Sequence, residues 1–163
     1  MKLFSLISFG TILLLPLTVA RAQCDCVGQT SEIRGSRYAS AFEDLNHSAV
    51  VFVGEVTEMR NVPKLQNSNS SGAKTYELKV RFQVQRACKR AVEEYLTLRT
   101  NVDDCIIGFE AGERYLVYAV ADGELLRTWY CSRTRLVARA QKDLDEFESH
   151  GVKPFEIKRA SKP

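Results

Sequence analysis

The segment Thr75–Gln85 reads TYELKVRFQVQ, and it decides the fold class. Every second position is apolar and the positions between are charged or polar; the apolar residues are Tyr76, Leu78, Val80, Phe82 and Val84. Alternation with a period of two is typical of an antiparallel strand with one face in the core and the other in solvent. The segment therefore predicts a half-buried strand and a mainly β domain around it.

Further strand signals lie on both sides of this segment. Ala49–Glu58 (AVVFVGEVTE) is rich in β-branched residues, and Gly54 within it predicts a bulge or a close approach of another backbone. Tyr95–Thr100 (YLTLRT) predicts another strand. A hairpin around the turn Asp122-Gly123 is predicted from its two flanks, Glu113–Ala121 and Glu124–Cys131.

Helices are predicted only near the two ends of the domain. Ser36–Asn46 places apolar residues at helical spacing, and Thr134–His150 does the same before Gly151, which fits a helix C-cap; the apolar face of the second helix consists of Leu136, Ala140, Leu144 and Phe147. The polar segment Asn61–Lys74 predicts a long exposed loop. Several short strands with flanking helices favour a small antiparallel barrel or a curled sheet.

Composition narrows the class of protein. The chain has 163 residues, of which 45% are hydrophobic and 26% charged, as expected for one globular domain. It carries 23 Lys and Arg residues against 20 Asp and Glu residues, a net charge of +3. Such a balanced chain has no overall field to attract nucleic acid or an anionic membrane, so neither is expected as a partner.

The first 22 residues predict a secretory signal peptide. Lys2 precedes an apolar run from Leu3 to Leu17, which is too short for a membrane span. The small residues Ala20 and Ala22 predict cleavage before Gln23, and this leaves 21 basic against 20 acidic residues. We therefore expect a secreted domain over residues 23–150, followed by a basic, mobile tail over residues 151–163. In a bacterial host, the same leader predicts export to the periplasm or beyond.

All five cysteines follow the leader: Cys24, Cys26, Cys88, Cys105 and Cys131. In an oxidising compartment they predict disulfides, and two bridges with one spare cysteine allow fifteen schemes. A bridge between Cys24 and Cys26 would be strained, so each is expected to pair with a distant cysteine. A zinc or copper site is the alternative, but neither His47 nor His150 has ligand-like spacing to a cysteine.

An ordered set of motifs resembles the netrin-like domain of the tissue inhibitors of metalloproteinases. The set begins with Cys24-Asp25-Cys26, a helix and the strand VFVGEV at residues 51–56. A cysteine, Cys105, then precedes the pattern G-F-x-x-G-E-x-Y-L-V-Y-A at residues 108–119, and T-x-x-C-S-R-T follows at residues 128–134. The resemblance extends from Cys24 to about Phe147, which is nearly the whole expected mature chain.

This resemblance implies a five-stranded OB-fold-like antiparallel barrel with flanking N-terminal and C-terminal helices. It also implies that Cys24 pairs with Cys105 and Cys26 with Cys131. Each bridge would close a loop of roughly 80 to 105 residues, and the chain-entropy model gives about 4 to 5 kcal/mol of stabilisation for each. The two bridges would hold the extended N-terminal segment against the barrel.

The resemblance further implies inhibition of extracellular zinc metalloendopeptidases. In that family the α-amine and carbonyl of the first cysteine chelate the zinc of the target protease, and Cys24 would have this role here. Asp25 would point toward the S1′ pocket, and the adjacent cleft would be filled by Cys26, Val27 and Gly28. A second contact ridge would consist of Asp103 and Asp104.

A non-inhibitory netrin-like module is the second hypothesis. Gln23 ahead of Cys24 would move the α-amine off the zinc, and an N-terminal Gln can cyclise and lose its amine. Asp25 would place a carboxylate before a pocket that is usually apolar, which costs desolvation. Such a module would bind an extracellular protein, or a glycosaminoglycan through the basic tail.

No catalytic constellation is present in the sequence. There are two histidines, neither near a nucleophile motif, and no glycine-rich phosphate loop, so we expect neither an enzyme nor a bound cofactor. His47 is expected at the surface end of a helix, and Cys88 as a buried thiol or an intermolecular link. Two glycosylation sequons begin at Asn46 and Asn69.

Overall fold

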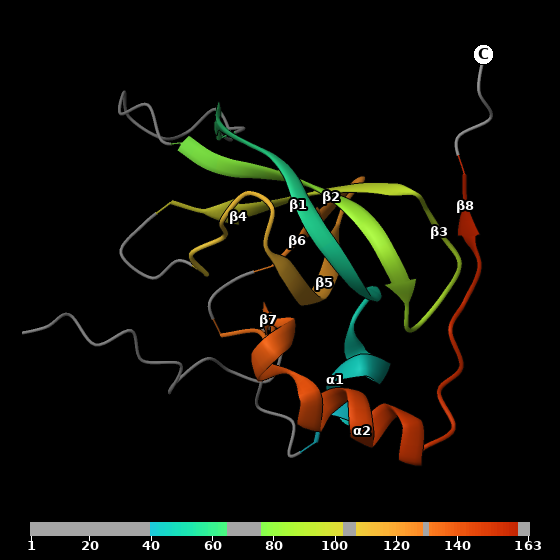
Figure 1. Cartoon of the computed structure of the whole chain (residues 1–163). Coiled ribbons are helices and arrows are strands. Elements are labelled where there is room, and N and C mark those ends of the chain that lie inside the picture. Colours follow the sequence, from blue (N-terminus) through green and yellow to red (C-terminus); the bar gives the residue numbers. More distant parts are fainter. Residues whose placement is uncertain (1–39, 65–75, 103–106, 129–130, 160–163) are drawn as a thin grey trace, which may run out of the picture.

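Five strands of the chain pair edge to edge around a closed ring (Figure 1). The computed structural model describes residues 40–64, 76–102, 107–128 and 131–159. Within these ranges the ring strands are β1 (Val50–Pro63), β2 (Tyr76–Ala87), β4 (Tyr95–Asn101), β5 (Arg114–Asp122) and β6 (Leu125–Arg127). Their order is β1-β2-β4-β6-β5, and β5 pairs again with β1. The predictions of a mainly β domain and of these strands are confirmed.

One seam of the ring differs from the all-antiparallel arrangement that the sequence predicts. β4 and β6 run parallel and pair at only two positions, Leu98 with Leu126 and Arg99 with Arg127. The β5–β6 hairpin around Asp122-Gly123 is confirmed, but β6 ends at Arg127. Because β6 is short, it joins β4 to β5 over a few residues only, and this seam has the fewest backbone pairs of the ring.

The interior of the ring is filled by alternate residues of the strands. Val80, Phe82 and Val84 of β2 are buried, as the period-two pattern predicts. Four aromatic rings contact one another edge to face across the interior, with centroids 4.8 to 5.5 Å apart; they belong to Phe52, Phe82, Phe109 and Tyr115. Edge-to-face contacts of this kind add to the stabilisation from burial alone.

Gly54 lies at a β-bulge in β1. The register with β2 shifts between Val53 and Gly54, which confirms the predicted bulge. A Cβ atom on Gly54 would lie 2.9 Å from the Phe52 ring and 3.1 Å from the carbonyl oxygen of Gln83. The close approach therefore requires glycine at this position, and it lets the Phe52 ring fold back against its own strand.

Glu77 is the exception to the polar outer face of β2. Its side chain is 0% exposed, although the alternation predicts a solvated residue. The carboxylate contacts Arg99 of β4 at 3.2 Å and Arg127 of β6 at 2.5 Å. Burial alone would raise its pKa, but hydrogen bonds and charges from Arg127 and Arg99 outweigh burial and lower it. One buried carboxylate thus holds together the two strands at the parallel seam.

Two helices cover one end of the ring (Figure 1). They are α1 (Ala41–His47) and α2 (Gln141–Ser149); they pack against each other and share a core with β1 and β5. A second core lies beneath them and contains Leu45 of α1 and Leu144 and Phe147 of α2; its other members include Val51, Val53, Leu116 and Tyr118. Gly151, at φ 72, follows α2 as the predicted C-cap requires.

The C-terminal helix is shorter than predicted, because the chain before it forms other structure. Residues Arg135–Leu136 form β7, which pairs with β5, and Val137–Arg139 form a single 3-10 turn. Leu136 packs against the ring core rather than beside Leu144. The prediction of a helix from Thr134 was therefore wrong for its first seven residues, since strand pairing overrides the helical spacing there.

The segment after Gly151 runs back along the ring. β8 (Ile157–Lys158) pairs in parallel with β3 (Val92–Glu93), and the Phe155 amide donates to the Ala87 carbonyl at 2.9 Å. Ile157 packs against the ring core. Within residues 151–159, the chain after Gly151 thus pairs with β3 and contacts Ala87 at the end of β2.

The remaining boundaries differ by a few residues. β1 continues to Pro63, so three residues of the predicted Asn61–Lys74 loop belong to the strand, and residues 65–74 lie outside the described ranges. The N-terminal helix begins at Ala41 within the described chain, after its cap Ser40. Among the residues that the structure describes, no helix is both long and apolar enough to cross a membrane.

Candidate functional site

Most of the predicted site residues lie outside the described ranges. These are Cys24, Asp25, Cys26, Val27, Gly28, Asn69, Asp103, Asp104 and Cys105. Cys131 and Asn46 are described: Cys131 is buried, and Asn46 is exposed on α1. The predicted Cys24–Cys105 and Cys26–Cys131 bridges therefore stay predictions. The structure does describe the residues that follow Cys105 and Cys131. These residues show how the chain is held next to two of the predicted bridge positions.

Tyr115 of β5 fixes the chain that follows Cys105. Its hydroxyl donates to the carbonyl oxygen of Gly108 at 3.1 Å and accepts from the amide of Glu110 at 3.0 Å. Burial raises the pKa of this hydroxyl, so it stays protonated and keeps its donor. Phe109 packs on the Tyr115 ring from inside the core. Residues 107–110 are thus tied to the β5 strand.

The same strand fixes the chain that follows Cys131. The amide of Tyr118 donates to the Thr134 hydroxyl oxygen at 2.9 Å, and the Tyr118 carbonyl accepts from the Thr128 hydroxyl at 2.9 Å. Thr128 and Thr134 are buried, and their hydroxyls lie 2.9 Å apart. Both threonines belong to the T-x-x-C-S-R-T pattern, whose polar positions therefore hold the turn around Cys131 against β5.

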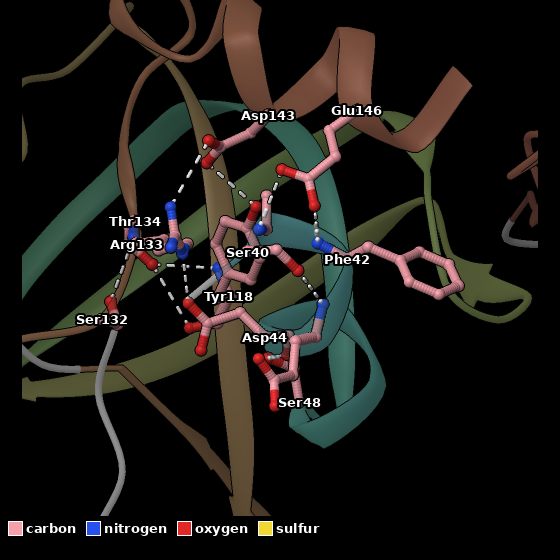
Figure 2. Close-up of polar contacts among 12 residues, drawn as sticks. Ser40, Phe42, Asp44, Ser48, Tyr118, Ser132, Arg133, Thr134, Asp143 and Glu146 are labelled. Carbon is pink, nitrogen blue, oxygen red and sulfur yellow. Dashed lines mark hydrogen bonds and ion pairs between the residues drawn. The ribbon is translucent and has the colours of Figure 1, made fainter. Parts of the chain in front are cut away.

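A buried ionic cluster joins this turn to both helices (Figure 2). Arg133 contacts Asp44 of α1 at 2.5 Å and Asp143 of α2 at 3.7 Å. Asp143 also accepts from the Tyr118 hydroxyl at 3.0 Å and pairs with Arg135. One cluster thus connects α1, α2, β5 and the turn after Cys131, so these parts cannot move independently without leaving a buried charge unpaired.

Electrostatics within the cluster follow from burial. Desolvation raises the pKa of Asp44, an effect that Arg133 opposes and the nearby Asp143 carboxylate reinforces. Desolvation and the adjacent Asp143 carboxylate raise the pKa of Tyr118, so its hydroxyl remains a donor at every physiological pH. The cluster therefore acts as a structural brace between α1, α2 and β5.

Glu146 of α2 fixes the point at which the chain enters α1. Its two carboxylate oxygens accept from the amides of Ala41 at 3.1 Å and Phe42 at 3.0 Å, at the first turn of α1 (Figure 2). Burial is the largest single influence and would raise the pKa of Glu146, but the backbone hydrogen bonds from Phe42 and Ala41, with smaller contributions from Ser40 and Arg133, together lower it. The helix that directly follows the N-terminal segment is therefore held to the helix that follows the Cys131 turn.

A hollow of about 380 Å³ lies between the two supported segments. It is lined by residues that follow Cys105, by β5 and by the chain from Thr134 to the turn before α2; these are Ile107, Gly108, Glu110, Tyr115, Thr134, Arg135, Leu136 and Arg139. Among the described residues there is no group of three or more potential metal ligands.

No protein-family model matches the chain, and no curated protein matches it.

Sequence reasoning missed the residues that build this support. Asp44, Asp143 and Glu146 sit at helix positions that the pattern treats as solvated, and their partners are distant in sequence. Only the T-x-x-C-S-R-T pattern carried a signal, because it contains Thr128, Arg133 and Thr134. His47 is exposed at the end of α1, as predicted.

Cys88 is free and 1% exposed, which agrees with the predicted buried thiol. Burial raises the pKa of its thiol to about 11, so only about one thiol in a thousand is ionised at pH 8. We expect iodoacetamide to alkylate Cys88 slowly in the folded protein and rapidly in denaturant, as measured by intact mass. Equal rates in the two conditions would show that the thiol is accessible in the folded state.

Proposed function

We propose that this chain is a secreted protein similar to the tissue inhibitors of metalloproteinases, and that it inhibits zinc metalloendopeptidases through an N-terminal cysteine wedge. The observation that carries the proposal is the convergence on β5. Tyr115 holds Gly108, three residues after Cys105, and Tyr118 holds Thr134, three residues after Cys131. Two bridges from an N-terminal Cys-x-Cys would need this common anchorage, because they must fix one segment at one end of the ring.

An OB-type barrel is the fold that we propose for the ring. Numbered by their order along the chain, the five ring strands follow one another around the ring as first, second, third, fifth and fourth. The fourth strand pairs with the first, and the third and fifth strands are parallel. OB-folds are five-stranded Greek-key barrels, and this connectivity is compatible with one. Such a barrel leaves the helices at one end and the wedge-bearing segment free to lie across it.

The chemistry assigned to the wedge is zinc chelation. A free α-amine ordinarily has a pKa near 7.7 to 8.0, so a chain that begins at Cys24 would carry a neutral fraction of its amine at physiological pH, and this amine would bind the protease zinc together with the Cys24 carbonyl. Asp25 would face the S1′ pocket, and Cys26, Val27 and Gly28 would fill the neighbouring cleft. Asp103 and Asp104 would form the second ridge. The chain acts here by binding, not by catalysis.

The brace of Arg133, Asp44 and Asp143 supports this proposal on energetic grounds. A wedge that is already ordered loses little entropy when it binds, and this improves affinity without new contacts. The ionic cluster holds the Cys131 turn to α1, and Glu146 holds the first turn of α1 to α2. Both ends of the chain between Cys26 and Cys131 would thus be attached to the same rigid unit.

The experiment is an inhibition titration of the secreted, unreduced protein against a panel of zinc metalloendopeptidases. Intact mass first establishes that the chain begins at Cys24 and contains two bridges. We expect loss of protease activity as the protein approaches an equimolar ratio, and no loss with a Cys26→Ser, Cys131→Ser double variant. Full protease activity in the presence of a large excess of the Cys24 form would reject inhibition and leave the netrin-like binding module as the function.

A further inference from the structure

Another hollow lies where the chain leaves α2 and turns toward β8 (Figure 1). Its volume is about 480 Å³, within the range of about 300 to 1,000 Å³ that is usual for small-ligand sites. Three parts of the chain line it: the C-terminal end of α1, the residues that directly follow β2, and residues 150–155. The described linings of this hollow and of the hollow beside Cys105 and Cys131 share no residue, so binding here is independent of the proposed wedge.

One part of the wall of this hollow is apolar. It consists of Leu45, Cys88, Val152, Pro154 and Phe155. Leu45 and Cys88 are buried, whereas the Phe155 ring is 45% exposed. The side chain of phenylalanine has no polar atom that could hydrogen-bond to the surrounding water. An apolar molecule in the hollow would remove part of this ring from water, which is favourable.

The exposed part of the wall is held in place by the fold. The amide of Phe155 donates to the Ala87 carbonyl at the end of β2, at 2.9 Å. The ring of His150, which also lines the hollow, stacks on the Phe42 ring of α1 with centroids 4.1 Å apart and planes 6° apart. A wall that is already formed loses little conformational freedom when a ligand binds, and this favours binding.

Two lysines bring positive charge to the same hollow. The Lys89 ammonium donates to two carbonyl oxygens at the end of α1, that of Asn46 at 2.6 Å and that of Ser48. An ammonium has three donors, so one remains, and neither Lys89 nor Lys153 forms an ion pair within the described part of the chain. Desolvation and the neighbouring Arg90 charge lower the pKa of Lys89. A bound anion would compensate for both effects and accept from the remaining donor.

We propose that this hollow binds a medium-chain aliphatic carboxylate. The carboxylate accepts hydrogen bonds from Lys89 and Lys153. The hydrocarbon chain packs against Val152, Pro154 and Phe155. A purely apolar molecule would leave the two ammonium groups without an anion, and a small anion would leave the phenyl ring in water. A ligand with a charged head and an apolar chain satisfies both parts of the wall.

The test follows amide chemical shifts of the full secreted chain as sodium octanoate is added. We expect saturation at one site with a dissociation constant on the order of 1 mM. Hexanoate should bind at least fourfold more weakly, because each buried methylene contributes up to about fourfold. Octanol should bind at least threefold more weakly than octanoate, although octanol is the more hydrophobic molecule. Equal or tighter binding of octanol would mean apolar adsorption only, and equal binding of acetate would mean attraction of any anion; either result overturns the proposal.

The same titration locates the site in the wild-type chain, so it does not depend on any variant folding. We expect the largest shift changes at the amides of Cys88, Lys89, Val152 and Phe155. The amide of Gly108, beside the other hollow, should change little. Changes centred away from residues 88–89 and 150–155, or no change up to about ten times the expected dissociation constant, would overturn the proposal.

Two variants test the two parts of the wall separately. Lys153→Met removes one cation and should weaken octanoate binding about threefold. Phe155→Ser removes the exposed ring but keeps the main-chain hydrogen bond to Ala87, and it should weaken binding about fivefold. The matched controls are Lys142→Met and Tyr76→Ser, which alter exposed side chains outside the hollow; the Tyr76 side chain is 48% exposed. The controls should stay within twofold of the wild type, and losses equal to those of the test variants would contradict the proposed site.

Discussion

Replacing Glu77 by alanine is expected to destabilise the protein by about 3 kcal/mol, because it leaves Arg99 and Arg127 side by side without their shared carboxylate. Both arginines are less than a quarter exposed, so solvent replaces the lost contact only in part. The loss falls on the parallel seam, where β4 and β6 have just two paired positions. Chemical denaturation of the wild type and of Glu77→Ala measures the difference.

Glu58→Ala is the matched control for this variant. It removes the same side chain from the neighbouring strand, where the carboxylate is 44% exposed and pairs with an exposed Arg60, so the expected cost is below about 1 kcal/mol. Hydrogen exchange adds a local readout, since the Thr128 amide donates to the Arg99 carbonyl across the seam at 3.2 Å. If Glu77→Ala costs no more than Glu58→Ala, or leaves exchange at Thr128 unchanged, the carboxylate does not hold the seam.

The pH dependence of stability gives a second check on the same residue. Burial would raise the pKa of Glu77, but Arg127 and Arg99 together bring it below the ordinary value of 4.5. A carboxylate with a lowered pKa in the folded state stabilises the protein above its unfolded pKa, and this contribution is lost as the pH falls through the folded pKa. Wild-type stability should therefore decrease below about pH 4.5 more steeply than that of Glu77→Gln.

The second large effect concerns the N-terminus. A chain that begins at Cys24 is expected to inhibit a zinc metalloendopeptidase about a thousandfold more strongly than a chain that begins at Gln23, since loss of a metal ligand costs several kcal/mol. One extra residue moves the α-amine by about 3.8 Å, and cyclisation of Gln23 removes that amine altogether. Inhibition constants of the two purified forms, each identified by intact mass, measure the ratio.

Asp25→Leu in the Cys24 form provides the control for pocket contacts. It keeps the α-amine and removes a carboxylate that would otherwise lose its hydration on entering an apolar pocket, so inhibition should be at least as strong as in the wild type. Equal inhibition by the Gln23 and Cys24 forms would show that the amine is not the ligand. A strong loss in Asp25→Leu would show that the carboxylate has a partner in the protease.

The ring strands were predictable because their signal is local. Val80, Phe82 and Val84 alternate with polar residues, and Gly54 marks the bulge in β1, so the pattern by itself identifies two strands and a close approach. Glu77 was not predictable in the same way. A glutamate on the polar side of an alternating strand looks solvated, but the fold buries it and pairs it with Arg99 and with Arg127, which the parallel pairing of β6 brings close.

The C-terminal part of the domain shows that pairing with a distant strand can override the helical spacing of apolar residues. Leu136 and Ala140 fit the helical face that continues to Leu144 and Phe147, but β5 offers an edge to which Arg135–Leu136 pair. The helix α2 then begins after Ala140. For the candidate site, the cysteine spacing and the T-x-x-C-S-R-T pattern indicated which segments matter, whereas the brace of Asp44, Arg133 and Asp143 depends on contacts between three separate elements.

The most direct test of zinc chelation by Cys24 is a visible absorption spectrum of a cobalt(II)-substituted metalloendopeptidase, recorded as the Cys24 form of the protein is added. Cobalt(II) replaces zinc with similar ligands, and its absorption depends on what is bound to the metal. The proposal predicts a spectral change that saturates at an equimolar ratio and disappears when the α-amine is acetylated. An unchanged spectrum in the presence of excess protein would contradict it.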